Sequence, residues 1–205
     1  MNKSSRTLSV VLALAGLWAG CGLLPGLNVI TGSGNVTRVD RPVSGFTAVA
    51  LDGSGEVTIT QGAGESLSIE AEDNLLPLIT SVVRDGVLRL DFNRGDWRDV
   101  IKPTKPIRFF VTMRDVSALD LAGSGTIQAG ALESPNLAVN VRGSGDVSLD
   151  EFRGDSLKAT LDGSGNITAA GQSQRLEVVL TGSGKVDAGS LESQTASVSV
   201  GGRAM

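Results

Sequence analysis

The sequence predicts an all-β fold, a β-solenoid with about 20 residues per coil. A Gly-Ser-Gly tripeptide recurs within residues 119–200, and the first glycines of its four copies lie 20, 20 and 19 residues apart. A fixed period of this size is typical of solenoids. Apolar and polar residues alternate on both sides of each tripeptide, for example at residues 139–141 and 147–149. This alternation indicates short strands with one buried face.

The glycines of the tripeptide are the predicted corners between strands. Glycine adopts positive φ without strain, so a Gly-x-Gly unit can turn the chain sharply. A third apolar position follows at Leu132, Phe152 and Leu191 and is broken at Gln172. Each repeat thus supplies two strands and a looser return, and stacking of neighbouring repeats provides the stability. The predicted structural turns are Gly53, Gly55, Gly123, Gly125, Gly143, Gly145, Gly163, Gly165, Gly182 and Gly184.

The N-terminus predicts an export signal. Two basic residues precede an apolar run at residues 8–19, which is too short to span a bilayer as a helix. Ala-Gly-Cys at residues 19–21 resembles the end of the bacterial lipobox, although Trp18 stands where leucine is usual. We expect cleavage before Cys21 and acylation of its thiol, with a plain secretory signal as the alternative. Because Cys21 is the sole cysteine, no intramolecular disulfide is expected.

The region between the early and late glycine corners departs from the period. Residues 74–80 are apolar and favour a helical turn, and residues 107–113 favour a strand. Asp85-Gly86 lies between two apolar runs and is a strong signal for a two-residue hairpin. The N-terminal half is therefore expected to be irregular and to contain a hairpin.

Several ordered motifs carry a resemblance to a known family. The chain resembles the family called putative auto-transporter adhesin, head GIN domain, over residues 35–205. The motifs lie at residues 46–49, 53–57, 61–62, 73–76 and 85–88 and in the later Gly-Ser-Gly turns. The resemblance implies a right-handed parallel β-helix and export by bacteria, and it carries over no catalytic residues. We expect a signal peptide at 1–20, a lipid-anchor tether at 21–31 and a head GIN-type domain at 32–205.

Composition excludes several function classes. The formal net charge is −4 and no basic cluster stands out, so nucleic acid is not an expected partner. The chain has no His, and its one Cys is expected to be acylated, which removes Ser-His and Cys-His nucleophiles. The residue after the corner varies too much for a calcium ligand. That residue is Glu56, Thr126, Asp146, Asn166 or Lys185 in successive copies.

No cofactor or metal is expected from these patterns. Residues 94–96 spell Arg-Gly-Asp, a tripeptide that some integrin ligands display, and we interpret it as a chance loop sequence. Residues 196–200 repeat only the first half of a coil. The outer edge of that strand is therefore expected to self-associate or to dock a partner strand.

These patterns favour an exported, non-catalytic binding, adhesion or scaffold module of the bacterial envelope. We expect an outer membrane lipoprotein on the periplasmic or cell-surface side, held at the membrane through its N-terminal lipid. A protein or a polysaccharide is the expected ligand. The alternative is a carbohydrate-active enzyme, a polysaccharide lyase or hydrolase, on the same fold. Sugar sites usually use aromatic platforms, and aromatic residues make up only 3% of the chain.

Overall fold

The computed structural model describes residues 28–92 and 99–201 of the chain. Strands dominate this part, and its one helical element is a turn of 3-10 helix, η1 (Leu76–Leu78). Among the described residues, no helix has the length and apolar character needed to span a bilayer. The strands are β1 (Asn28–Thr31), β2 (Val36–Arg41), β3 (Ala48–Gly53), β4 (Glu56–Gln61), β5 (Ser66–Glu72), β6 (Ile79–Arg84), β7 (Val87–Phe92), β8 (Asp99–Lys102), β9 (Arg108–Met113), β10 (Ala118–Gly123), β11 (Thr126–Glu133), β12 (Asn136–Gly143), β13 (Asp146–Gly163), β14 (Asn166–Gly182) and β15 (Lys185–Gly201).

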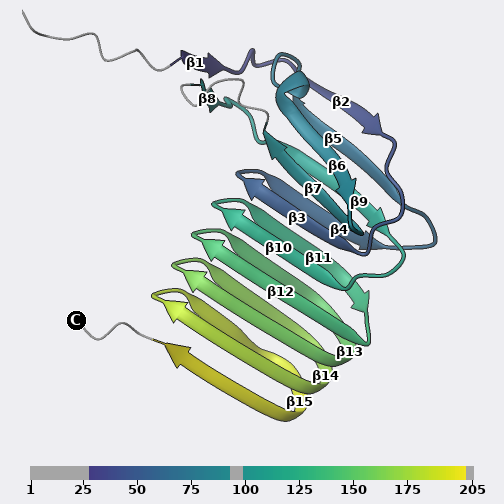
Figure 1. Cartoon of the computed structure of the whole chain (residues 1–205), viewed down its shortest axis with the longest axis vertical. Helices are drawn as coiled ribbons and strands as arrows, with labels where there is room; N and C mark the ends of the chain where they lie inside the picture. Colours follow the sequence, from purple (N-terminus) through teal and green to yellow (C-terminus); the bar gives the residue numbers. More distant parts are fainter. Residues whose placement is uncertain (1–27, 93–98, 202–205) are drawn as a thin grey trace, which may run out of the picture.

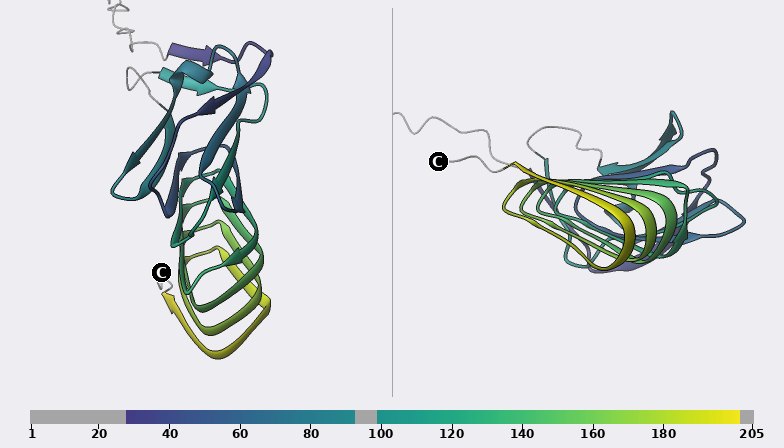
Figure 2. Two further views of the ribbon diagram at one scale, coloured as in Figure 1. Left: turned by 90° about the vertical axis from the view of Figure 1, so that its right-hand side faces the viewer. Right: turned by 90° about the horizontal axis from the view of Figure 1, so that it is seen from below.

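The predicted fold class is wrong in its architecture. The fold is all-β, but 13 strands form one sheet of mixed order instead of a parallel β-helix. The path through the sheet is β2-β5-β9-β4-β11-β13-β12-β10-β3-β7-β6, with β14 and β15 added beside β13. Antiparallel pairs occur at both ends of this path, because β5 pairs with β2 and β9, and β6 pairs with β7. The sheet curls round until it is nearly closed about one core (Figure 2).

The two antiparallel regions have different causes. β6 and β7 form a hairpin that turns at Asp85 and Gly86, with φ of 52° and 76°. Positive φ at both central residues is the geometry that Asp-Gly favours, so the predicted hairpin is confirmed. β5 instead lies between β2 and β9, which are distant from each other in sequence. β5, β6, β7 and β9 therefore extend the main sheet, where the sequence predicted an irregular region.

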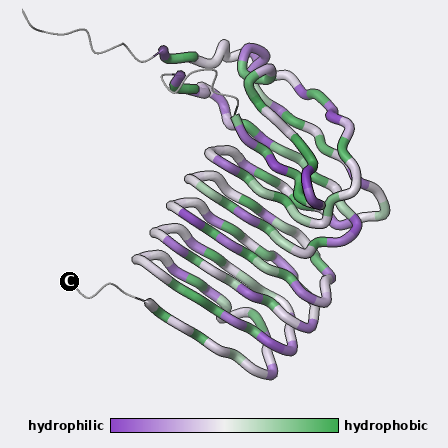
Figure 3. The backbone as a smooth tube through the Cα atoms, viewed as in Figure 1, coloured by the Kyte–Doolittle hydropathy of each residue, from purple (hydrophilic) through white to green (hydrophobic). Residues whose placement is uncertain are grey.

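The later strands lie side by side in parallel tiers along the long axis (Figure 1). Each residue faces a residue 19 or 20 positions further along the chain, as Leu119 faces Val139 and Val139 faces Ala159. Along each strand, every second side chain points into the core and the ones between them point to solvent, because successive side chains of a strand lie on opposite faces of the sheet. Figure 3 shows the resulting alternation of hydrophobic and hydrophilic residues along the tiers.

A single hydrophobic core fills the interior of the curled sheet. Phe46, Phe109 and Phe152 are its largest fully buried side chains, and the rest is mainly Leu, Ile, Val and Ala. Two further elements match their predicted places: η1 falls within residues 74–80, and β9 falls within residues 107–113. β1 and β8 form a separate two-stranded parallel sheet above the main one (Figure 1).

Candidate functional site

The predicted corner glycines lie at stacked turns between strands. The first glycine of each corner has positive φ, with values of 128° at Gly53, 124° at Gly123, 115° at Gly143, 139° at Gly163 and 111° at Gly182. The corners are also joined by backbone hydrogen bonds. The Ser164 N–H donates to the carbonyl oxygen of Gly143 at 2.8 Å, and the Asn166 N–H donates to that of Gly145 at 3.2 Å.

The second glycines of the four later corners are constrained by space instead of by φ, whereas Gly55 also has a positive φ, of 154°. A Cβ on Gly145 would lie 2.6 Å from the Gly125 carbonyl oxygen, and a Cβ on Gly165 would overlap the Gly145 carbonyl oxygen. Gly125, Gly145, Gly165 and Gly184 therefore occupy positions that only glycine fits. The serine between the glycines faces solvent at Ser164. The stacked corners therefore form a ridge in which the backbone of each corner packs against the backbone of the preceding one.

Two sequence-predicted features lie outside the described residues. One is the N-terminal segment with its signal peptide and Cys21, and the other is the Arg-Gly-Asp tripeptide at residues 94–96.

The residues that follow the corners make side-chain ladders on the surface. The Asn166 amide Nδ2 donates to Asp146 Oδ1 at 2.7 Å, and Lys185 Nζ donates to Asp187 Oδ2 at 2.7 Å. The Lys185 ammonium lowers the pKa of the Asp187 carboxyl, with help from the Gly189 N–H. Within residues 28–92 and 99–201, no three His, Cys, Asp or Glu side chains come close enough to hold a metal ion.

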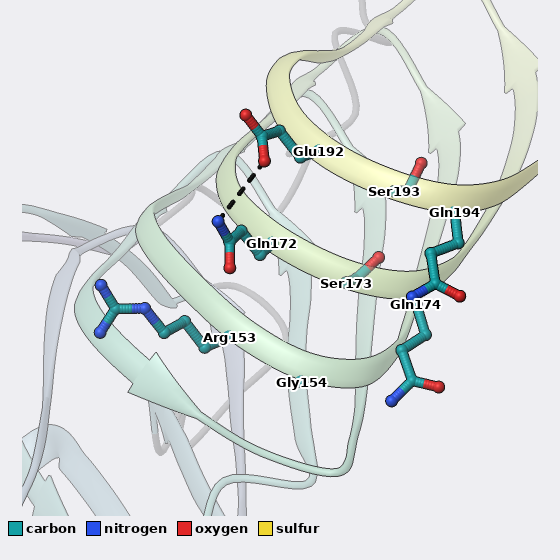
Figure 4. A pocket seen from close by; sticks show the side chains of 8 residues that line it. All are labelled: Arg153, Gly154, Gln172, Ser173, Gln174, Glu192, Ser193 and Gln194. Atoms are coloured by element: carbon teal, nitrogen blue, oxygen red, sulfur yellow. Dashed lines mark hydrogen bonds between the residues drawn. The ribbon is translucent and has the colours of Figure 1, made fainter.

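A concave polar surface lies on β13, β14 and β15, and we call it the polar groove. It has a volume of about 480 Å³. Its lining residues are Arg153, Gly154, Gln172, Ser173, Gln174, Glu192, Ser193 and Gln194. They stand in rows across the three strands, because Arg153 faces Gln172 and Gln172 faces Glu192, while Gly154 faces Ser173 and Ser173 faces Ser193 (Figure 4). Gln174 and Gln194 form the other side of the groove (Figure 4).

The groove presents donors and acceptors in alternation. Gln172 Nε2 donates to Glu192 Oε2 at 3.4 Å, a weak bond that leaves both groups able to bind elsewhere. Gln174 Nε2 donates to Asp155 Oδ1 at 2.7 Å, and the Arg153 guanidinium pairs with Glu151. These bonds fix side-chain positions while the amide oxygens face the groove or solvent. The arrangement suits recognition of a polar ligand by hydrogen bonds.

Buried residues support the groove from beneath. Phe152 and Leu191 lie in the core directly before Arg153 and Glu192 in the chain, and Gly171 lies between them in the register. Gln172 therefore does not occupy the apolar position that the sequence pattern assigned to it. The 19-residue spacing of this repeat places Gly171 there, and Gln172 joins the polar row.

Sequence reasoning missed the groove, although a signal was present. The polar residues Arg153, Gln172 and Glu192 each follow the inward position at the bend of a tier. If Gly171, and not Gln172, is aligned with Phe152 and Leu191, the three polar residues fall in one row.

A second, less polar pocket lies between β8 and the first glycine corners. It has a volume of about 330 Å³ and is lined by Gly53, Ser54, Phe92, Asp99, Val100, Ile101, Pro103, Gly123 and Ser124. Val100 is 41% exposed, and Ile101 packs partly against the main core. This pocket has no convergent row of polar groups comparable with the polar groove.

A buried carboxylate, Glu72 at the end of β5, links the segment before β2 to the segment before β9 at the upper end of the molecule in Figure 1. Its side chain has no exposed surface and accepts hydrogen bonds from the Thr104 hydroxyl at 2.5 Å and the Gly34 N–H at 2.6 Å. The N–H groups of Thr104 and Lys105 also donate to it. The Thr104 hydroxyl is the main cause that lowers the pKa of Glu72 to about 2, since its bond outweighs the opposing effect of burial. No pattern in the sequence marks this site.

Comparison with known proteins confirms the family resemblance. The model of the family described as "Putative auto-transporter adhesin, head GIN domain" matches residues 45–205. No curated protein shows a significant match.

Solved structures with similar folds include three from Bacteroides and Parabacteroides. A protein of Bacteroides fragilis described as a putative adhesin is 22% identical, with a TM-score of 0.76 over 84% of this chain and 79% of its own. A putative adhesin of Parabacteroides distasonis is 20% identical, with a TM-score of 0.66 over 85% and 82%. A third, described as a putative lipid binding protein of the same species, is 19% identical, with a TM-score of 0.68 over 85% and 83%. At these identities the likeness shows a shared fold.

Proposed function

The chain belongs to the putative auto-transporter adhesin, head GIN domain family, and from this premise we propose that it is an exported, non-catalytic binding module of the bacterial envelope. Proteins with similar folds are described as putative adhesins or as a putative lipid binding protein, and none of the three compared is described as an enzyme. The single observation that supports a binding role for this chain is the polar groove on β13, β14 and β15.

The proposed ligand is a polysaccharide strand. Glutamine amides and serine hydroxyls both donate and accept hydrogen bonds, and Arg153 and Glu192 add one donor group and one acceptor group. Sugar hydroxyls also donate and accept, so a polyhydroxylated chain can bond to the row of Arg153, Gln172 and Glu192. The buried Ser173 hydroxyl instead donates to the Arg175 carbonyl oxygen. The lining residues are spread over three strands along an open surface (Figure 4). Such a surface fits an extended polymer better than a small molecule, which usually lies in an enclosed pocket.

Anchoring at the membrane through Cys21 is the second part of the proposal. It is supported by the apolar run at residues 8–19 followed by Ala-Gly-Cys. A lipoprotein with two or more acyl chains is held stably, whereas a single chain gives marginal binding. The binding module would then stand off the outer membrane on its N-terminal tether.

A screen of the purified chain against polysaccharides tests this function. Retention on immobilised polysaccharides measures binding, and release of new reducing ends or unsaturated ends measures catalysis. We expect retention by at least one polysaccharide and no product release. Release of product would instead identify a carbohydrate-active enzyme. Failure of every polysaccharide to retain the chain, with retention by a protein ligand, would contradict the proposed ligand.

Variants of the groove connect that binding to the proposed surface. Gln172→Ala and Gln194→Ala each remove an amide, and losing one ligand hydrogen bond typically costs about 1 kcal/mol, roughly a fivefold weaker affinity. Gln128→Ala is the matched control, because Gln128 is an exposed glutamine that bonds an acidic side chain, Asp150, at 3.2 Å outside the groove.

A further inference from the structure

The outer edge of β15 is an open edge of the main sheet. β15 has 17 residues and pairs with β14 on one side only. Within the described residues nothing pairs with its other side, so backbone N–H and C=O groups point outward along its length. Unpaired groups of this kind form a template for another strand.

Inward-facing hydrophobic side chains form columns across β13, β14 and β15. At the outer edge of β15, no strand of the described residues covers the last side chain of each column. Leu161, Leu180 and Val200 face one another across β13, β14 and β15, and so do Ala159, Val178 and Val198. Val178 is 6% exposed, but Val198 and Val200 are 65% and 66% exposed. These are the two most exposed large hydrophobic side chains among the described residues. One more strand on β15 would continue both columns and bury them.

The C-terminal segment of this edge lacks the features that normally block such pairing. Residues 193–201 contain no charged residue and no proline. Protected edges usually carry lysine, proline or a bulge. A neutral segment also does not repel a second copy of itself.

The other edges of the sheet fit β15 poorly. β2 carries Arg38, Asp40 and Arg41, and β6 ends with Arg84. A head-to-tail contact would therefore place the neutral segment of β15 beside charges. The same segment of a second β15 carries no charge and exposes the same two valines.

We propose that two copies of this chain associate end to end through their β15 edges. The contact is isologous: a two-fold axis crosses the segment at residues 195–201, and the two strands pair antiparallel. With the axis near Val198, Ala196 of one copy faces Val200 of the other, and all inward side chains stay on the inward face. The two cores then join into one, and the polar grooves lie on both sides of the junction.

Sedimentation velocity of the full chain, purified with its mature N-terminus in mild detergent, tests the association. We expect a concentration-dependent dimer. Val198→Lys should weaken the dimer at least tenfold, because two lysines would meet near the axis. Val36→Lys and Val82→Lys are matched controls on the edges of β2 and β6, where the valines are 45% and 43% exposed. Both should dimerise like the parent.

A charge-swap mixture tests the two-fold geometry. Val198→Lys and Val198→Glu should each be monomeric alone and should form a mixed dimer when combined, because opposite charges then face across the axis. Ser199→Lys, whose side chain faces solvent, repeats the test if either Val198 variant shows a lowered melting temperature by circular dichroism. A monomeric parent at the highest attainable concentration would overturn the proposal, as would equal effects of lysine on β15 and β2. Failure of the mixture to associate would overturn the two-fold arrangement.

Discussion

The amide of Ser164 donates to the carbonyl oxygen of Gly143 at 2.8 Å, and the neighbouring Gly163 stands so close that any Cβ there would overlap the same oxygen. Gly163 also has a φ of 139°, which β-branched residues avoid. One corner therefore depends on glycine for two reasons, conformation and space. The same relationship links Gly143 to Gly123 and Gly182 to Gly163, so the corners support one another along the ridge.

Gly163→Val should be among the most damaging single substitutions in the chain. The side chain would impose backbone strain and displace the Gly143 corner, so the loss of unfolding free energy should exceed the roughly 1 kcal/mol typical of point mutations. Thermal melting by circular dichroism measures the effect. Ser164→Ala, at the exposed centre of the same corner, is the control and should change stability by no more than about 0.5 kcal/mol. Parental melting of Gly163→Val would show that the corner tolerates a side chain.

Glu72→Gln should destabilise the upper end of the molecule. The Thr104 hydroxyl and the Gly34 N–H both donate to this buried carboxylate, and an amide offers one acceptor oxygen in place of two. We expect a lower melting temperature than for Glu133→Gln, which changes an exposed glutamate on β11. Equal melting of the two variants would mean that the Glu72 hydrogen bonds contribute little.

The acid stability of the protein should depend on Glu72. Its pKa of about 2 in the folded state lies below the ordinary value of 4.5, so the unfolded chain binds the proton more readily. The stabilisation is therefore complete above about pH 4.5 and is lost as the pH falls towards 2. Chemical unfolding of the parent should show a steeper loss of stability across this range than Glu72→Gln does. Parallel pH profiles for the two proteins would contradict the lowered pKa.

Cys21→Ser should move the protein out of the membrane fraction of a bacterial host. The prediction follows from the lipobox-like end of the N-terminal segment, because serine cannot receive the thioether-linked lipid. Fractionation followed by immunoblotting measures the change. Trp18→Leu, which restores the usual lipobox residue, should leave the protein at the membrane. A Cys21→Ser protein that stays there would rule out lipidation as the anchor.

The local parts of the fold could be predicted from sequence, and the long-range parts could not. The Asp85-Gly86 hairpin depends on two residues with positive φ, and the parallel register of β12, β13 and β14 follows from the glycine spacing. The placement of β5 between β2 and β9 has no such marker. Its antiparallel pairing depends on burial of Leu67 and Ile69 in a core shared with strands far along the chain.

The sites illustrate the same distinction. No motif distinguishes Glu72 from the other acidic residues of the chain, and its partner Thr104 lies 32 positions away. The polar groove was obscured because one repeat is a residue shorter, which placed Gln172 in an apolar column that belongs to Gly171. Composition alone could not recover either arrangement, since both depend on which strands become neighbours.

The most direct measurement is the dissociation constant of a retained polysaccharide for the parent and for the Gln172→Ala/Gln194→Ala double variant. Titration calorimetry at equal ionic strength provides both values, with Gln128→Ala as the control for an exposed glutamine outside the groove. If the polar groove binds the ligand, the double variant should bind about tenfold or more weakly while melting like the parent, and Gln128→Ala should bind like the parent. Equal affinity of the double variant and the parent would contradict the assignment of the groove as the binding surface.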